Sequence, residues 1–227
     1  ELHPEGRTIK NARGKNRLHV TVHPSTGYIL LYFMKDGEST ESAVMKALCR
    51  IKDAGHEVKW VVADSGVGSA LRNKLRKKGM DINLVPPQNH RANKAERGID
   101  LAKRVILGML SGASKDFDFA NADLAEAQAE IVLNITRQGK CREESAYKSF
   151  HRKDYDWDAY PLNVFGTRCE VHRGEDDMTS LSFKTYSAFY VSPALEAYRC
   201  YRILPVGGTA LSTADTVMFY PEYIRTP

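Results

Sequence analysis

The stretch "YILLYFM", from Tyr28 to Met34, constrains the fold of this chain more than any other. Such a nearly continuous apolar run, without polar alternation, is typical of a central strand that is covered on both faces. The preceding "RLHVTV" is rich in β-branched residues, and Pro24 and Gly27 lie between the two segments, which predicts a strand, a turn and a second strand. The second strand is therefore expected to lie at the centre of a sheet.

Helical and extended patterns alternate after this pair. "STESAVMKALCRIKDAG" predicts a helix that starts at Ser39 or Thr40 and stops at Gly55. "EVKWVVAD" predicts another buried strand that ends at Asp64, "SALRNKLRKKG" a short basic helix, and "DINLV" a short strand. Two helices follow: a long one from near residue 93, and "NADLAEAQAEIVLNITRQ", for which Asn121 is the expected N-cap. This order predicts an α/β domain over residues 1–138.

The pattern changes in the last third of the chain. Residues 139–160 are rich in charged and aromatic side chains, which indicates a linker or docking segment. Residues 161–227 contain the short extended segments "GTRCEVHR", "SFKTYSAFYVSP", "AYRCYRILP" and "TADTVMFYP", separated by turn residues. Four or five short strands without a helix predict a small all-β barrel.

Composition narrows the class of protein. Hydrophobic residues make up 42% and charged residues 27%, and no apolar run approaches the roughly 18 residues that a membrane span requires, so no membrane partner is expected. The net charge of +5 is compatible with binding to a polyanion. The four cysteines form no CxxC pair, which disfavours a zinc module and favours reduced thiols in an intracellular protein.

Two carboxylates stand at positions suited to chemistry. Asp64 ends a predicted strand, and ligands of open α/β sheets collect beyond the strand ends. Glu96 follows the Pro-Pro turn of "VPPQNHRANKAERGID", at the start of the long helix. Two-metal phosphoryl transfer requires carboxylates from separate elements to hold cations about 3.5–4 Å apart. A simpler interpretation explains the residues equally well. In it, Asp64 only caps the end of a strand, and Glu96 only interacts favourably with the positive end of the helix macrodipole.

Read together, "HPSTGYILLYFM", "VVADSGVGSAL" and "VPPQNHRANKAERGI" resemble the catalytic core of retroviral and retrotransposon integrases, most of all those of copia-like elements of protists. "GTRCEVHR", "SPALEAYRCYR" and "ADTVMFYP" resemble the C-terminal domain of the same group. The resemblance implies a ribonuclease-H-like core with a mixed sheet flanked by helices, followed by a small SH3-like barrel. It also implies a polynucleotidyl transferase ancestry with Mg²⁺ or Mn²⁺ at an acidic site.

The resemblance assigns roles to particular residues. Asp64 falls on the second catalytic Asp of the family and Glu96 on its catalytic Glu, so both are expected metal ligands, and Asn93 and Arg97 flank the Glu as they do in relatives.

The first catalytic Asp of the family has no counterpart. His3 stands where it is expected, Glu1 and Glu5 are out of register, and Thr21, the alternative position, is not acidic. Because Mg²⁺ prefers oxygen ligands, a histidine at that position weakens the site, and the acidic triad is expected to be broken.

Basic residues are the expected nucleic-acid contacts, either DNA or RNA, although a solvated helix face explains those of the short helix equally well. The predicted set comprises Arg72, Lys74, Arg76, Lys77, Arg91, Asn93, Lys94, Arg97 and Lys103.

Two functions therefore compete. The first is a domesticated, catalytically inactive integrase descendant that binds nucleic acid or serves as a scaffold subunit in a larger assembly or homo-oligomer. The second is an active retroelement integrase that joins DNA ends by metal-dependent strand transfer, which would place the protein in the nucleus.

Overall fold

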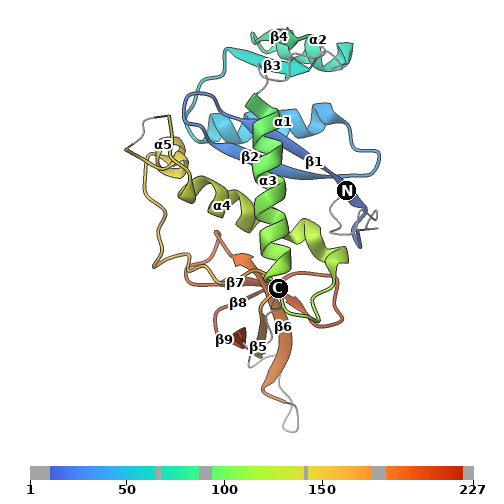
Figure 1. Ribbon diagram of the computed structural model, residues 1–227, viewed down its shortest axis with the longest axis vertical. Helices are drawn as coiled ribbons and strands as arrows, with labels where there is room; N and C mark the ends of the chain where they lie inside the picture. Colours follow the sequence, from blue (N-terminus) through green and yellow to red (C-terminus); the bar gives the residue numbers. More distant parts are fainter. Residues whose placement is uncertain (1–10, 65–67, 87–93, 141–142, 175–182, 222–227) are drawn as a thin grey trace. The chain divides into compact units, whose positions relative to one another are not determined.

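The computed structural model describes residues 11–64, 68–86, 94–140, 143–174 and 183–221 (Figure 1). In chain order the helices and strands are β1 (Lys15–Val22), β2 (Ile29–Lys35), α1 (Thr40–Asp53), β3 (Trp60–Asp64), α2 (Ser69–Lys77), β4 (Asp81–Val85), α3 (Lys94–Ser111), the 3-10 helix η2 (Phe119–Ala125), α4 (Glu126–Thr136), α5 (Ala146–His151), β5 (Arg168–His172), β6 (Thr185–Pro193), β7 (Tyr201–Pro205), β8 (Ser212–Ala214) and β9 (Val217–Phe219). The predicted α/β class is confirmed.

The chain divides into two compact units that each combine segments distant in sequence. Unit 1 contains residues 1–15, 104–132 and 155–227, and unit 2 contains residues 16–103 and 133–154. Two of the boundaries fall inside α3 and α4, so this division differs from the expected one at residues 138 and 161. Residues 139–154 belong to unit 2 and include α5, a helix where a linker or docking segment was expected.

In unit 2, β1 and β2 form a two-stranded sheet. Their short connection requires an antiparallel pair, because parallel strands need a crossover of a dozen or more residues. One side of β2 packs on α1 and α5, where Tyr28 and Leu30 meet Ile51 and Phe150. The Tyr28 and Phe150 rings are stacked with centroids 4.1 Å apart. Helix α1 starts at the N-cap Ser39, as predicted, since the Ser39 side chain accepts a hydrogen bond from the Ser42 amide.

The Asn134 side chain of α4 binds the backbone of β2. Its Oδ1 accepts a hydrogen bond from the Ile29 amide and its Nδ2 donates one to the Ile29 carbonyl, both at 2.8 Å. Asn134 is fully buried. The amide side chain therefore takes the place of a neighbouring strand, and the buried backbone groups of β2 stay paired. The prediction that β2 is buried on both faces is confirmed.

Strands β3 and β4 form a second, parallel sheet with α2. Leu71 and Leu75 of α2 pack with Leu48 of α1 and with Val61 and Ile82 of the two strands. The prediction that β3 is a buried strand is wrong for the face opposite α2, because Trp60 is 63% exposed and Val62 is 49% exposed.

The single mixed sheet that the resemblance implies is not formed within the described residues. They contain two separate pairs, β1–β2 and β3–β4. Within each pair, the facing backbone groups of the two strands are hydrogen-bonded to each other. Helices cover one face of the β3–β4 pair.

In unit 1, five antiparallel strands form a sheet in the order β8-β7-β6-β5-β9. The sheet is strongly curled, because the Phe219 ring of β9 meets the Tyr201 ring of β7 with centroids 5.4 Å apart, although two strands lie between them. In a flat sheet three strand spacings would place them about 14 Å apart. The strands predicted here are confirmed, but within the described residues β8 and β9 are unpaired edges, so the expected closed barrel is not formed.

Asp123 of η2 anchors the segment that precedes β1. Its carboxylate is fully buried and lies 3.0 Å from the Arg13 guanidinium and 3.8 Å from the Lys15 ammonium. Asn121, the predicted N-cap, instead lies inside η2 with non-helical backbone angles, and the Asp118 side chain caps that helix. Asp118 takes this position because its carboxylate accepts the hydrogen bond from the Ala120 amide.

Candidate functional site

Asp64 is the last residue of β3, as predicted, and its register partner on the parallel strand β4 is Val85. Parallel strands end at the same edge of a sheet, so the chain leaves both strands at one place. Beyond Asp64 the described chain resumes at Gly68, whose extended backbone precedes the first turn of α2. This edge is the position at which an α/β fold collects reactive groups.

Glu96 lies in the first turn of α3 and is half-buried. Its helix approaches β1 very closely at Gly98. A Cβ atom at Gly98 would lie 2.9 Å from Val22 Cγ2, 3.1 Å from Val20 Cγ1 and 3.7 Å from Ile29 Cδ1. The absence of a side chain at residue 98 therefore lets the first turns of α3 rest directly on the β1–β2 pair, which fixes the backbone that carries Glu96.

The sequence contains a signal for this contact, which is a glycine within a helical pattern. A search for carboxylates and cations does not find it. A glycine within a helical pattern lowers helix stability and often marks a close packing contact. Gly98 in "NKAERGID" is such a glycine. Its role is to position the turn that contains Glu96.

Strand β1 supplies no carboxylate to this site. Its sequence "KNRLHVTV" contains neither Asp nor Glu. Val20 and Val22 face Gly98, and since side chains alternate along a strand, His19 and Thr21 point to the other face. There His19 Nε2 lies 3.0 Å from Thr21 Oγ1, and burial lowers the pKa of His19 and favours the neutral ring.

The described side chains therefore do not fit a complete two-metal site. Among them no group of three His, Cys, Asp or Glu residues is arranged to hold a metal ion. Asp64 and Glu96 are two acids where the two-metal scheme requires three. The other positions considered for the missing acid, Glu1, His3 and Glu5, lie outside the described residues.

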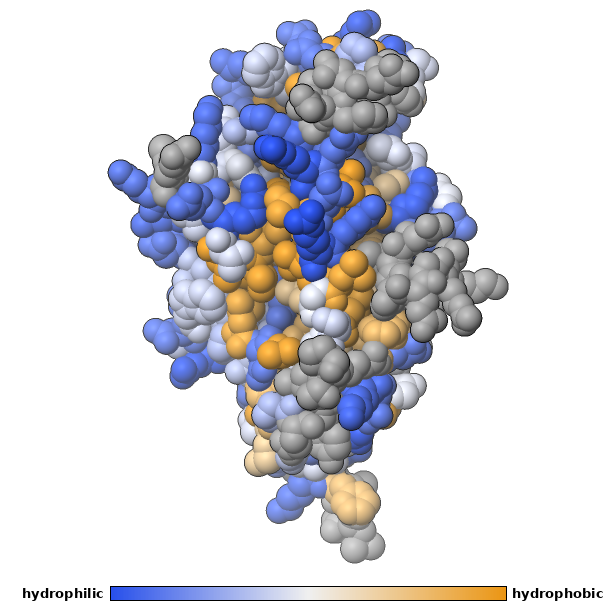
Figure 2. Space-filling model, viewed as in Figure 1, coloured by the Kyte–Doolittle hydropathy of each residue, from blue (hydrophilic) through white to orange (hydrophobic). Residues whose placement is uncertain are grey.

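The predicted basic contacts on α2 lie close in sequence to its buried residues, Leu71 and Leu75. Arg76 and Lys77 are exposed, and Arg72 is half-buried. The Lys74 ammonium lies 2.7 Å from Glu41 Oε1, so the Glu41 carboxylate partly neutralises its charge. In the view of Figure 2, hydrophilic residues predominate at the top, where Figure 1 places α2 and β4.

The predicted contacts near Glu96 follow α3. Lys94, Arg97 and Lys103 are exposed. Arg91 and Asn93 lie outside the described residues. Unit 2 thus exposes cations on two helices: α2, which follows Asp64 in the chain, and α3, which contains Glu96.

Comparison with known proteins yields a distant likeness to a solved structure. No family model matches the chain, and no curated protein matches it. A chain of the simian T-cell lymphotropic virus intasome in complex with the PP2A regulatory subunit B56 gamma, solved by cryo-electron microscopy, matches with a TM-score of 0.48 and 18% identity. The match covers 87% of this chain and 69% of that chain. A likeness this distant assigns neither a family nor an activity.

No helix within the described residues has the length and apolar character needed to cross a membrane.

Proposed function

We propose that the chain is an integrase-derived nucleic-acid-binding protein, catalytically inactive and used as a binding or scaffold subunit of a larger assembly. The observation that carries this proposal is the absence of an acidic residue on β1, whereas Asp64 ends β3 and Glu96 lies in the first turn of α3. Two carboxylates without the third hold a pair of divalent cations poorly, because each lost negative charge lowers the affinity for the second ion.

The exposed cations of α2 and α3 support the binding part of the proposal. Each cation that neutralises a phosphate releases counterions, so the affinity for nucleic acid falls steeply with salt concentration. Arg76 and Lys77 are exposed on α2, and Arg97 is exposed beside Glu96. A phosphate backbone bound to unit 2 could thus meet exposed positive charges on either helix.

Fluorescence anisotropy with a labelled DNA duplex and the matching RNA duplex, between 50 and 300 mM salt, tests the binding proposal. In Arg76→Gln/Lys77→Gln we expect the slope of log K against log salt to become shallower by about 1–2, close to 0.9 for each lost phosphate contact. The control Lys35→Gln/Lys140→Gln removes the same charge from exposed positions elsewhere in unit 2. Absence of binding to either duplex, or equal effects of both pairs, would refute the assigned surface.

The second candidate is an active integrase. It is favoured by the positions of Asp64 at the strand edge and Glu96 on a helix that Gly98 fixes against β1. With Mg²⁺ or Mn²⁺ bound, the two carboxylates would be ligands, and the metal would supply Lewis-acid stabilisation of the transferring phosphate. Such an enzyme would act in the nucleus.

Calorimetric titration with Mg²⁺ and Mn²⁺ separates the two candidates. The inactive-subunit proposal expects no saturable binding at millimolar metal. Saturable binding that both Asp64→Asn and Glu96→Gln abolish would favour the active enzyme, and strand transfer with labelled DNA ends would then establish it.

A further inference from the structure

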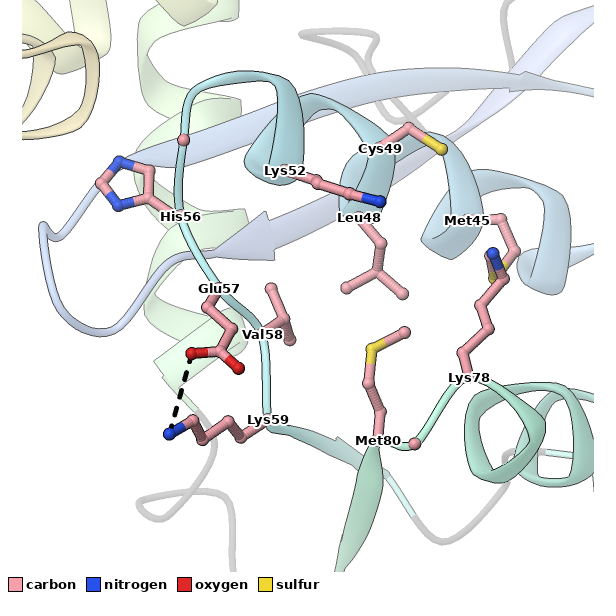
Figure 3. Close-up of a pocket in the computed structure, with 12 residues that line it drawn as sticks. Met45, Leu48, Cys49, Lys52, His56, Glu57, Val58, Lys59, Lys78 and Met80 are labelled. Carbon is pink, nitrogen blue, oxygen red and sulfur yellow. Dashed lines mark ion pairs between the residues drawn. The ribbon is translucent and has the colours of Figure 1, made fainter.

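A pocket of about 600 Å³ opens in unit 2 between the C-terminal half of α1, the segment that leads into β3, and the turn between α2 and β4 (Figure 3). Glu96 is not among the residues that line it. Its volume lies within the range of about 300–1,000 Å³ that is usual for small-molecule sites. The pocket is therefore large enough for a small-molecule ligand.

The floor of the pocket is apolar. Leu48 of α1, Val58 and Met80 converge in its middle (Figure 3). All three belong to the hydrophobic cluster that joins α1 to α2, so the floor is the open end of a packed core. Met45 adds a flexible thioether at one side, a side chain that adapts to ligands of irregular shape.

The rim of the pocket is cationic. Lys52, Lys59 and Lys78 lie around the apolar floor. Lys59 is paired with Glu57 at 3.7 Å, whereas Lys52 and Lys78 form no ion pair with any of the described residues. Two ammonium groups beside an apolar floor favour a ligand that combines an anionic group with an apolar body.

Neighbouring polar groups leave this charge uncompensated. The Glu57 and Lys59 side chains are each 80% exposed, so their ion pair is weak. The His56 Nε2–H group donates a hydrogen bond of 2.8 Å to the Phe150 carbonyl. Among the described residues that line the pocket, Glu57 is the only acid, so this part of the lining carries an excess of positive charge.

We propose that this pocket is a binding site for a small amphipathic organic anion, a carboxylate or sulfonate carried on an aromatic or aliphatic body. Lys52 and Lys78 attract the anionic group. Leu48, Val58 and Met80 take up the apolar body. This inference does not depend on nucleic-acid binding or on metal binding by the chain.

The test uses two dyes that differ in one group. 8-Anilinonaphthalene-1-sulfonate carries a sulfonate, and N-phenyl-1-naphthylamine has the same rings without it. We expect saturable binding of the sulfonate dye at one site, and a dissociation constant raised about fivefold or more in Lys52→Gln/Lys78→Gln, with little change for the neutral dye. The control Lys35→Gln/Lys140→Gln removes equal charge from exposed positions elsewhere in unit 2.

Cys49 provides a second readout, because it is exposed and lines the pocket. Bound sulfonate dye should slow its alkylation by iodoacetamide, followed by peptide mass spectrometry, whereas Cys200 in unit 1 should react at an unchanged rate. Cys49→Trp should place a bulky ring at the pocket and abolish binding of both dyes. If this variant does not fold, the lysine variants decide the matter.

The proposal is overturned by any of three results: non-saturable binding, equal weakening by the two lysine pairs, or dye binding that leaves Cys49 alkylation unchanged. Saturable binding that depends on Lys52 and Lys78 and protects Cys49 supports it. Neither result bears on the salt-dependent binding of duplexes, so the two proposals fail independently.

Discussion

Replacement of Gly98 by alanine tests the contact that positions Glu96. In an exposed helix interior, Gly→Ala stabilises a protein by about 1 kcal/mol, because alanine loses less backbone entropy on folding. At Gly98 the added methyl group would lie 2.9 Å from Val22 Cγ2 and 3.1 Å from Val20 Cγ1. These are β-branched side chains on a strand, which move only with strain.

The expected magnitude follows from two opposing contributions. Overpacking in a well-packed interior costs about 1–3 kcal/mol. Offset by the gain of about 1 kcal/mol in helix propensity, Gly98→Ala should lower the free energy of unfolding by about 0–2 kcal/mol. Gly108 is the matched control, because it lies in the same helix and a Cβ atom added there would meet no neighbour within 4 Å. Gly108→Ala should raise the free energy of unfolding by about 1 kcal/mol.

Urea unfolding followed by circular dichroism at 222 nm measures both variants, and each transition is fitted separately if the two units unfold apart. Val22→Ala in the Gly98→Ala background removes the nearest methyl group and should restore stability, with a coupling energy of about 1–2 kcal/mol in the double-mutant cycle. If Gly98→Ala stabilises the protein as much as Gly108→Ala, or if Val22→Ala gives no coupling, the close approach of α3 to β1 is refuted.

Two further predictions concern buried polar groups in unit 2. Asn134→Ala leaves the buried Ile29 amide and carbonyl without their side-chain partner, which should cost about 2–4 kcal/mol in unfolding free energy and speed hydrogen exchange of the Ile29 amide, as NMR can follow. Burial, Lys153, Arg50 and His56 lower the pKa of the His151 ring from 6.5 to about 4. The neutral ring is thus favoured in the folded state, and the stability that it contributes is present above pH 6.5 and lost as the pH falls toward 4. His151→Gln should flatten this loss in thermal unfolding between pH 7 and 4, and an undiminished pH dependence would contradict the assignment.

Local patterns predicted the elements well but not their partners. The apolar run from Tyr28 to Met34 is the buried strand that was expected, and the Ser39 cap begins α1 as its hydrogen-bonding chemistry requires. Trp60 was assigned to a buried strand because its neighbours are apolar, yet it lies on the open face of β3. Whether a face is covered depends on a distant element, and a short window of residues contains no information about that element.

In the candidate site, too, some features depend on nearby residues and others depend on distant elements. Asp64 at a strand end and Glu96 in the first turn of a helix follow from the chain alone, since strand ends and helix starts are set by nearby residues. The sequence of β1 also shows directly that this strand contains no acidic residue.

Only the tertiary structure decided how these pieces are held. The close approach at Gly98 joins two segments more than seventy residues apart. The Asn134 bridge to Ile29 joins segments 105 residues apart, and the pocket beside Lys52 and Lys78 forms where three separate elements meet. Such contacts depend on shape and on the pairing of buried polar groups across the fold. The sequence by itself determined which elements form and where charge lies along them, because these properties depend on neighbouring residues. The packing that brings the elements together into sites depends on residues far away in the chain.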